Sequence, residues 1–246
     1  MREDQNNFSY WYPKIKDCGA HVPESVIIPV PDEIVECFFM ERKTDEDTVY
    51  QFVKEQVLPR IPKEFAPLVF VKNGTFSNKY DFRSCVTHPD ALDIARSIID
   101  INYMALLYGA DGCTELVFRK HVRDDGKHYE IYGGMPLQPE FRVFYDFDRR
   151  KVLYTANYWD WDYCHDTIAH QSMTDGLVYE KAYEEIEKFY ETQKDDVARI
   201  AGDVLKDVKL DGKWSVDFMY ADGKYWLIDM ATAEKSAYWE PGREDR

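Results

Sequence analysis

The segment 214–230 constrains the fold most, because it predicts a β-hairpin with one acid in each arm. Two apolar, aromatic-rich stretches flank a polar turn that contains Asp222 and Gly223, and Asp-Gly between such stretches is typical of hairpin turns. Asp217 and Asp229 lie among residues that should be buried, where an unpaired carboxylate is costly. The hairpin can set these acids side by side to hold a divalent cation. The alternative is that each acid pairs with a Lys or Arg.

Length, composition and charge exclude several classes of protein. The chain has 246 residues and 45% hydrophobic content, which suits one large domain or two lobes that share a cleft. Five cysteines without a Cys-x-x-Cys pair predict free thiols, no disulfide and no zinc site. The polar, acidic start and the lack of a long apolar run predict a cytoplasmic protein with no membrane span. A net charge of −15 disfavours direct nucleic-acid binding and favours a basic protein partner.

The order of the predicted elements indicates an α+β fold. Periodicity and turn residues predict helices at about 32–40, 45–57, 89–108 and 178–208, the last with a candidate break near 192–194. They predict strands at about 66–71, 115–122, 141–146 and 152–157, with 1–30 mostly irregular and the tail 240–246 frayed. Glycine-rich strand-to-helix phosphate motifs are absent from the sequence, so we expect mainly antiparallel sheets. We expect two lobes, 1–110 with the strand that ends at Lys72 and 111–246 with the final hairpin.

Two stretches carry basic residues that a phosphate group would need. Lys72 leads into a small-residue loop that reaches Lys79, and such a loop can cradle phosphates through its backbone N–H groups. Taken alone, this loop is better explained as a solvated turn. The strand at 115–122 ends in Arg119, Lys120 and His121, so its backbone edge can pair with an adenine while the cations reach the ring or the phosphates. An ordinary strand with charged ends is the alternative.

Two further stretches are ambiguous. Alternation places Glu140, Arg142 and Asp146 on one face of a strand, where Arg142 can clamp a phosphate or join a cross-strand ion pair. The aromatic and acidic run at 158–165 can form a substrate-facing rim. We favour a structural role for that run, because its Cys and His spacing fits no metal site.

Taken together, these segments resemble the ATP-grasp superfamily and, within it, the cell-division-cycle protein 123 family. The resemblance covers most of the chain, and it rests on the order and spacing of several motifs. These motifs are the aromatic segment 7–13, the segment 25–31, Lys72 with the residue before it, 115–120, 140–144, and the two strands around Asp217 and Asp229.

The resemblance implies an ATP-grasp fold that encloses a nucleotide cleft, with ATP and Mg²⁺ bound between the lobes. It implies metal ligation by Asp217 and Asp229 and a catalytic role for Arg142. It also implies nucleotide contacts from Lys72, Lys79, Arg119, Lys120, Val122 and Arg142. One departure concerns the metal motif, which usually continues as acid-x-Asn and here has Ala231, a residue that cannot ligate. Thr232 and Glu234 are candidate substitutes.

Two functions follow from the resemblance, and the sequence does not decide between them. The first is an ATP-dependent ligase that joins a carboxylate to an amine through an acylphosphate, with Arg142 and the lysines offsetting developing charge. The second is a nucleotide-bound platform that assembles a protein partner, as the resembled family does for translation initiation factor 2. Ala231 favours the second slightly, because binding tolerates a weakened catalytic centre. An α+β domain without a nucleotide is the third reading.

Overall fold

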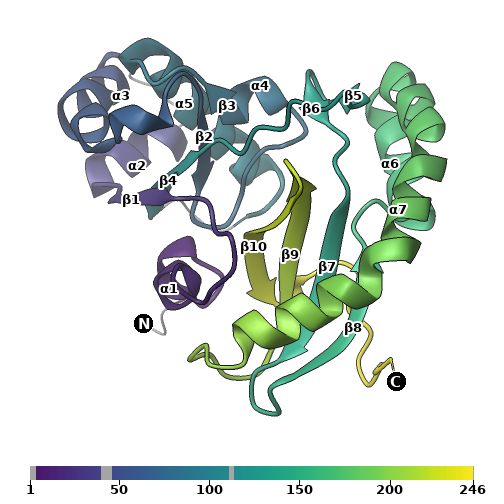
Figure 1. The fold of residues 1–246 in the computed structure, drawn as a ribbon. Helices are drawn as coiled ribbons and strands as arrows, with labels where there is room; N and C mark the ends of the chain where they lie inside the picture. The colour runs from purple at the N-terminus through teal and green to yellow at the C-terminus, as the bar shows by residue number, and fades with distance from the viewer. Residues whose placement is uncertain (1–3, 40–45, 111–113, 246) are drawn as a thin grey trace.

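The computed structural model describes residues 4–39, 46–110 and 114–245, and it confirms the α+β class. Two four-stranded sheets, both antiparallel, form separate layers, with strand orders β1-β4-β2-β3 and β10-β9-β7-β8. Figure 1 shows the first sheet beside α2, α3 and α5, and the second sheet crossed by the long helix α7.

The first lobe, as the structure describes it, contains α2 to α5 and β1 to β4. Their bounds are α2 Asp32–Phe39, α3 Glu46–Phe52, α4 Phe82–Cys85, α5 Ala91–Leu107, β1 Ser25–Pro29, β2 Val69–Asn73, β3 Val86–Thr87 and β4 Glu115–Lys120, with short turns of π- or 3₁₀-helix at Val53–Val57, Leu58–Arg60 and Lys63–Phe65. The elements that complete the chain are α1 Phe8–Ile15, β5 Glu130–Ile131, β6 Met135–Pro136, β7 Glu140–Asp146, β8 Lys151–Asn157, α6 Trp161–Gln171, α7 Met173–Leu205, β9 Lys213–Ala221, β10 Lys224–Thr232 and a 3₁₀ turn at Ala233–Lys235.

Each sheet has its own core, and strand alternation decides which side chains face the space between them. In β4, Leu116 and Phe118 pack with the helices of the first lobe, whereas Val117 packs in the core of the second sheet. Successive residues of a strand point to opposite faces, so Arg119 shares the face of Val117. In β2, Val69 and Val71 pack with the helices, which turns Phe70 and Lys72 toward the second lobe.

The sheets do not follow the predicted division at residue 110. β4 lies beyond that point in the chain, yet it is a central strand of the first sheet. Helix α1 lies before it, yet Phe8 and Trp11 pack in the core of the second sheet. Long-range strand pairing and burial therefore set the lobes, and sequence order alone does not reveal them.

Several local expectations need correction. The irregular N-terminal stretch contains α1, whose buried Phe8, Trp11, Tyr12 and Ile15 follow helical spacing despite Pro13. The helix predicted from 178 begins at Met173 and continues without a break to Leu205. The tail predicted to fray is ordered, because the Glu240 N–H donates to the Tyr154 hydroxyl (2.7 Å) and the Asp245 N–H to the Leu153 carbonyl (2.8 Å). Among the described residues, no helix is both long and apolar enough to cross a membrane.

Candidate functional site

Three charged residues form a row across the second sheet. Arg142 of β7 is the register partner of Asp217 in β9, and Asp217 is the partner of Asp229 in β10. Directly opposed residues in antiparallel strands share a face. A β-bulge between Leu227 and Asp229 shifts the register by one residue, and without it Ile228 would face Asp217. The prediction that the hairpin sets the two acids side by side is confirmed.

Both oxygens of Asp217 are engaged by Arg142. The Arg142 Nε donates to Asp217 Oδ1 at 2.8 Å, and Nη2 donates to Oδ2 at 2.7 Å. Burial lowers the pKa of Arg142, but Asp217 raises it by more, so the net shift is upward. Such a bidentate, charge-assisted pair fixes both side chains. The structure therefore places Arg142 on Asp217, and Arg142 is not among the described residues that line the cavity below.

Asp229 pairs with a cation from the other lobe. Its Oδ1 accepts a hydrogen bond from the Lys72 ammonium at 3.2 Å, and the Lys72 side chain is 4% exposed whereas that of Asp229 is 46% exposed. Burial raises the pKa of Asp229, but Lys72 and then Arg119 lower it, and the net shift is downward. Asp229 thus stays ionised and keeps part of its carboxylate open, which is the state a metal ligand needs.

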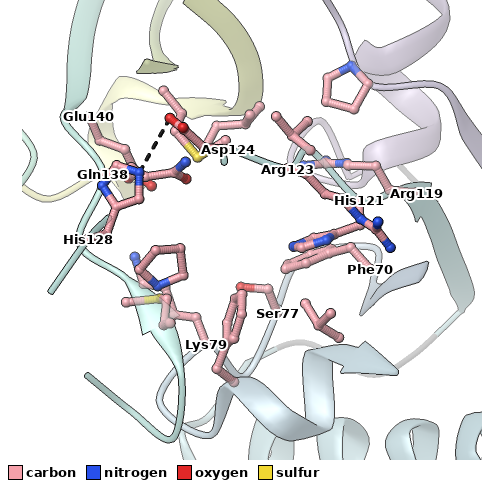
Figure 2. A pocket seen from close by; sticks show the side chains of 18 of the residues that line it. Phe70, Ser77, Lys79, Arg119, His121, Arg123, Asp124, His128, Gln138 and Glu140 are labelled. Atoms are coloured by element: carbon pink, nitrogen blue, oxygen red, sulfur yellow. Dashed lines mark ion pairs between the residues drawn. The ribbon is translucent and has the colours of Figure 1, made fainter. Parts of the chain in front are cut away.

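A cavity of about 650 Å³ lies between the two sheets, a volume typical of small-molecule sites. Figure 2 shows Gln138, Glu140 and His128 on one side of it, and Phe70, His121 and Arg119 on the other. Its lining joins charged groups to an apolar wall: Lys72, Lys79, Arg119, Glu140, Asp217 and Asp229, with Leu68, Phe70, Phe82, Val86, Val122 and Met135. The arrangement suits an anionic ligand that also carries an apolar ring.

Arg119 is a buried cation that forms no ion pair with any acid that the structure describes. Its side chain lines the cavity at 8% exposure. Its Nε has no hydrogen-bond partner, and among the described residues Arg119 forms no ion pair. Burial lowers the pKa of its guanidinium, while Asp229 opposes that shift. A buried charge without a partner is strongly unfavourable, so this position is suited to receive an anion.

Lys79 and Glu140 are two further titratable residues on the cavity wall, and neither forms an ion pair with a residue that the structure describes. The Lys79 ammonium lies 4.0 Å from the centroid of the Tyr158 ring, and burial lowers its pKa although Glu140 opposes the shift. Burial raises the pKa of Glu140 to about 7, against the opposing effect of Lys79. Near neutral pH, Glu140 therefore exchanges its proton readily, whereas Asp217 and Asp229 are held by Arg142 and Lys72.

The two residues that follow β4 lie outside the strand pairing of the first sheet. The backbone of 115–120 is already paired with β1 on one side and β2 on the other, and the Lys120 N–H donates to Glu24 (2.8 Å). The edge available to a base therefore begins at His121 and Val122, both of which line the cavity. Lys120 itself is exposed and lies outside the cavity lining.

Sequence reasoning missed some of the lining. His121 has a pKa lowered to about 4, by burial first and by Arg123 second, so its imidazole is neutral at pH 7. The His128 Nε2 lies 3.4 Å from Asp124 Oδ2 within the segment 123–134. The charged residues of that segment did not indicate that it forms part of a cavity wall. Of the aromatic run, Tyr158 lines the cavity, whereas the run from Trp161 begins helix α6.

Solved structures share this architecture. C-terminally truncated Cdc123 from Schizosaccharomyces pombe matches with a TM-score of 0.56 and 16% identity, over 95% of this chain and 86% of that one. A second Cdc123 structure from that organism matches with a TM-score of 0.52 and 17% identity, over the same shares. The chain has an ATP-grasp fold. The resemblance seen in the sequence is thus confirmed for the fold, and identities this low show the fold alone.

Other comparisons are weaker. The D-alanine–D-alanine ligase from Bacillus anthracis, solved in complex with ATP, matches with a TM-score of 0.44 and 9% identity, over 92% of this chain and 52% of that one. No protein-family model and no curated protein sequence matches the chain.

Proposed function

We propose that the chain binds ATP with Mg²⁺ in the cavity between the two sheets. The observation that carries this proposal is Arg119, a buried guanidinium that lines a cavity containing two opposed aspartates and that forms no ion pair within the described part of the chain. A phosphate chain supplies the missing anion for Arg119. The same chain would also meet the ammonium groups of Lys72 and Lys79.

The donor set at the second sheet suits Mg²⁺. This ion prefers oxygen ligands and commonly uses one or two carboxylates together with substrate phosphates and water. Asp217 and Asp229 supply the two carboxylates, and the open part of Asp229 is the more accessible of them. Ala231 follows on the same face of β10 and adds no oxygen. When bound, the ion would offset negative charge on the phosphates.

The base would lie at the end of β4. His121 and Val122 have backbone groups outside the sheet pairing, and Phe70, Phe82 and Met135 provide apolar surface. This orientation places the phosphates toward Arg119 and Asp229. The resemblance seen in the sequence assigned Lys120 and Arg142 to the nucleotide, but neither residue lines the cavity. Arg142 would instead act on the site by holding Asp217 in place.

The chemistry that best suits this site is ATP-dependent joining of a carboxylate to an amine. Activation of the carboxylate by phosphate transfer requires dense positive charge around the phosphates, which Lys72, Lys79 and Arg119 provide. The subsequent attack by an amine requires a group that accepts a proton. Glu140, on the same wall and with a pKa of about 7, is suited to that step.

A nucleotide-bound platform for a protein partner is the second candidate. Ala231 favours it, because its side chain adds no oxygen to the pair of aspartates, and binding tolerates a weakened catalytic centre better than catalysis does. The fold shared with Cdc123 and the net charge of −15, which suits a basic partner, also support it. Phosphate release separates the two: a ligase releases phosphate when a small carboxylate and an amine are added, whereas a platform does not.

Calorimetric titration with a non-hydrolysable ATP analogue tests the binding proposal. We expect saturable binding that strengthens when Mg²⁺ is present. The surface pair of Asp196 and Arg199 supplies the matched control, since Asp196→Asn removes one acid far from the cavity lining. No binding at millimolar analogue in the wild type would contradict the proposal.

A further inference from the structure

The N-terminal helix is fixed to both sheets at the edge of the candidate site. The Phe8 N–H donates to the Gly74 carbonyl at 3.0 Å, next to β2, and the Ser9 N–H donates to Glu115 Oε1 of β4 at 2.9 Å. On the other sheet, the Thr232 N–H of β10 donates to Asn6 Oδ1 at 2.8 Å. These three bonds hold the residues around Phe8 in a defined place between the lobes.

The Phe8 ring lies close to two cations of the cavity wall. Its centroid is 5.1 Å from Arg119 Cζ and 5.7 Å from Lys72 Nζ. The Phe70 ring is 5.6 Å from Arg119 Cζ. All three distances fall within the range of about 6 Å in which a cation is attracted to an aromatic face. Phe8 is itself 1% exposed, so the attraction acts with little screening by water.

The two cations differ in what else they meet. Lys72 has Asp229 as an acid partner, whereas the guanidinium of Arg119 has aromatic rings where an ion pair would be expected. Rings stabilise a cation without neutralising it. An acid in their place would occupy the donors of Arg119 and compete with an incoming anion. The rings leave these donors available.

We propose that Phe8 is a positioning residue of the nucleotide site, whose ring, together with that of Phe70, stabilises the buried Arg119 guanidinium in place and leaves its N–H donors available to a phosphate group. This inference rests on the proposed function. It makes the N-terminal helix part of the phosphate site, although that helix does not itself line the cavity.

Replacement of Phe8 by pentafluorophenylalanine tests the proposal. The fluorinated ring nearly keeps the volume of the phenyl ring but reverses the charge distribution that attracts cations. We expect the affinities for tripolyphosphate and for the ATP analogue to fall at least about fivefold, since a cation–π contact of this kind is worth about that factor. The affinity for adenosine, which lacks phosphate, should not change.

Phe65 provides the matched control. It is 2% exposed in the core of the first lobe, and among the described residues it has no cation over its ring. The same fluorination there should leave tripolyphosphate binding unchanged. Equal losses for adenosine and tripolyphosphate at Phe8, or no loss at all, would overturn the proposal.

A second measurement needs no ligand. A double-mutant cycle between fluorinated Phe8 and Arg119→Met, followed by urea unfolding, measures the coupling of the two side chains directly. We expect the fluorination to raise the unfolding equilibrium constant in both backgrounds. The factor of increase should be at least about threefold larger when Arg119 is present than when Met replaces it. Absence of coupling would refute the role of Phe8. If the wild type bound neither tripolyphosphate nor ATP while the coupling was present, the proposed function would fail and the contact between Phe8 and Arg119 would stand.

Discussion

Substitution of Asp217 by Asn tests the arrangement of the charged row most sharply. The change keeps the size of the side chain but removes the charge that holds Arg142 through two bonds of 2.8 and 2.7 Å. The side chains of Arg142 and Asp217 are only 14% and 7% exposed, so the guanidinium would be left buried with a neutral partner. Removal of one member of a buried pair costs about 3–5 kcal/mol, and the retained amide oxygen moves the expected loss toward the lower end.

Urea unfolding followed by tryptophan fluorescence measures this loss. We expect Asp217→Asn to lower the free energy of unfolding by about 3 kcal/mol, with an unchanged dependence on urea. The control is Asp196→Asn, which breaks an exposed pair with Arg199 and should cost less than about 0.5 kcal/mol. Equal, small losses in both variants would refute the reasoning, because Arg142 would then not depend on Asp217.

Four further predictions concern the cavity. Asp229→Asn should weaken Mg²⁺-dependent binding of the ATP analogue by at least about tenfold, or about 1.4 kcal/mol, and unchanged affinity in calorimetry would contradict its role as a ligand. Arg119→Met should abolish tripolyphosphate binding. It should also raise the free energy of unfolding of the ligand-free protein, because it removes a buried charge that forms no ion pair with a described residue. A variant that is less stable than the wild type in urea would contradict this prediction. The raised pKa of Glu140, about 7, means that the folded state holds its proton more tightly than the unfolded state. Wild-type stability should therefore decline between about pH 4.5 and pH 7 relative to Glu140→Gln, and parallel pH profiles of the two proteins would refute the shift. Ala231→Asn should tighten Mg²⁺-dependent binding by restoring an oxygen, and no change would mean that another oxygen already fills that place.

The hairpin was the most predictable part of the site, because its signals are local. The turn residues and the two apolar arms predicted that Asp217 and Asp229 would face each other, and the register confirms it. The bulge that brings them into register has no clear local signal. The structure shows a basic partner for each acid, which is one of the two alternatives raised for them. The metal site, which is the other alternative, stays a proposal.

The basic end of β4 shows what sequence reasoning could not resolve. Arg119 and Lys120 are neighbours, yet only Arg119 lines the cavity. Strand alternation predicts that the side chains of Arg119 and Lys120 point to opposite faces of β4. It does not predict which of these faces lies against the second lobe. That choice is set by pairing with β1 and β2, whose positions in the chain are distant.

The role of α1 was also hidden, because it depends on long-range contacts. The stretch 1–30 was predicted to be mostly irregular, because Pro13 obscured the helix within its aromatic segment. Hydrogen bonds from this segment to Glu115 and to the region of Gly74 join parts of the chain that are far apart in sequence. Periodicity within one segment carries no information about such partners.

A crystal structure with Mg²⁺ and a non-hydrolysable ATP analogue tests the central claim most directly. We predict phosphate oxygens against Arg119 and Lys72, a metal ion between the phosphates and the pair of Asp217 and Asp229, and the base beside Val122. A nucleotide bound elsewhere, or a cavity without nucleotide at saturating concentration, would contradict the account.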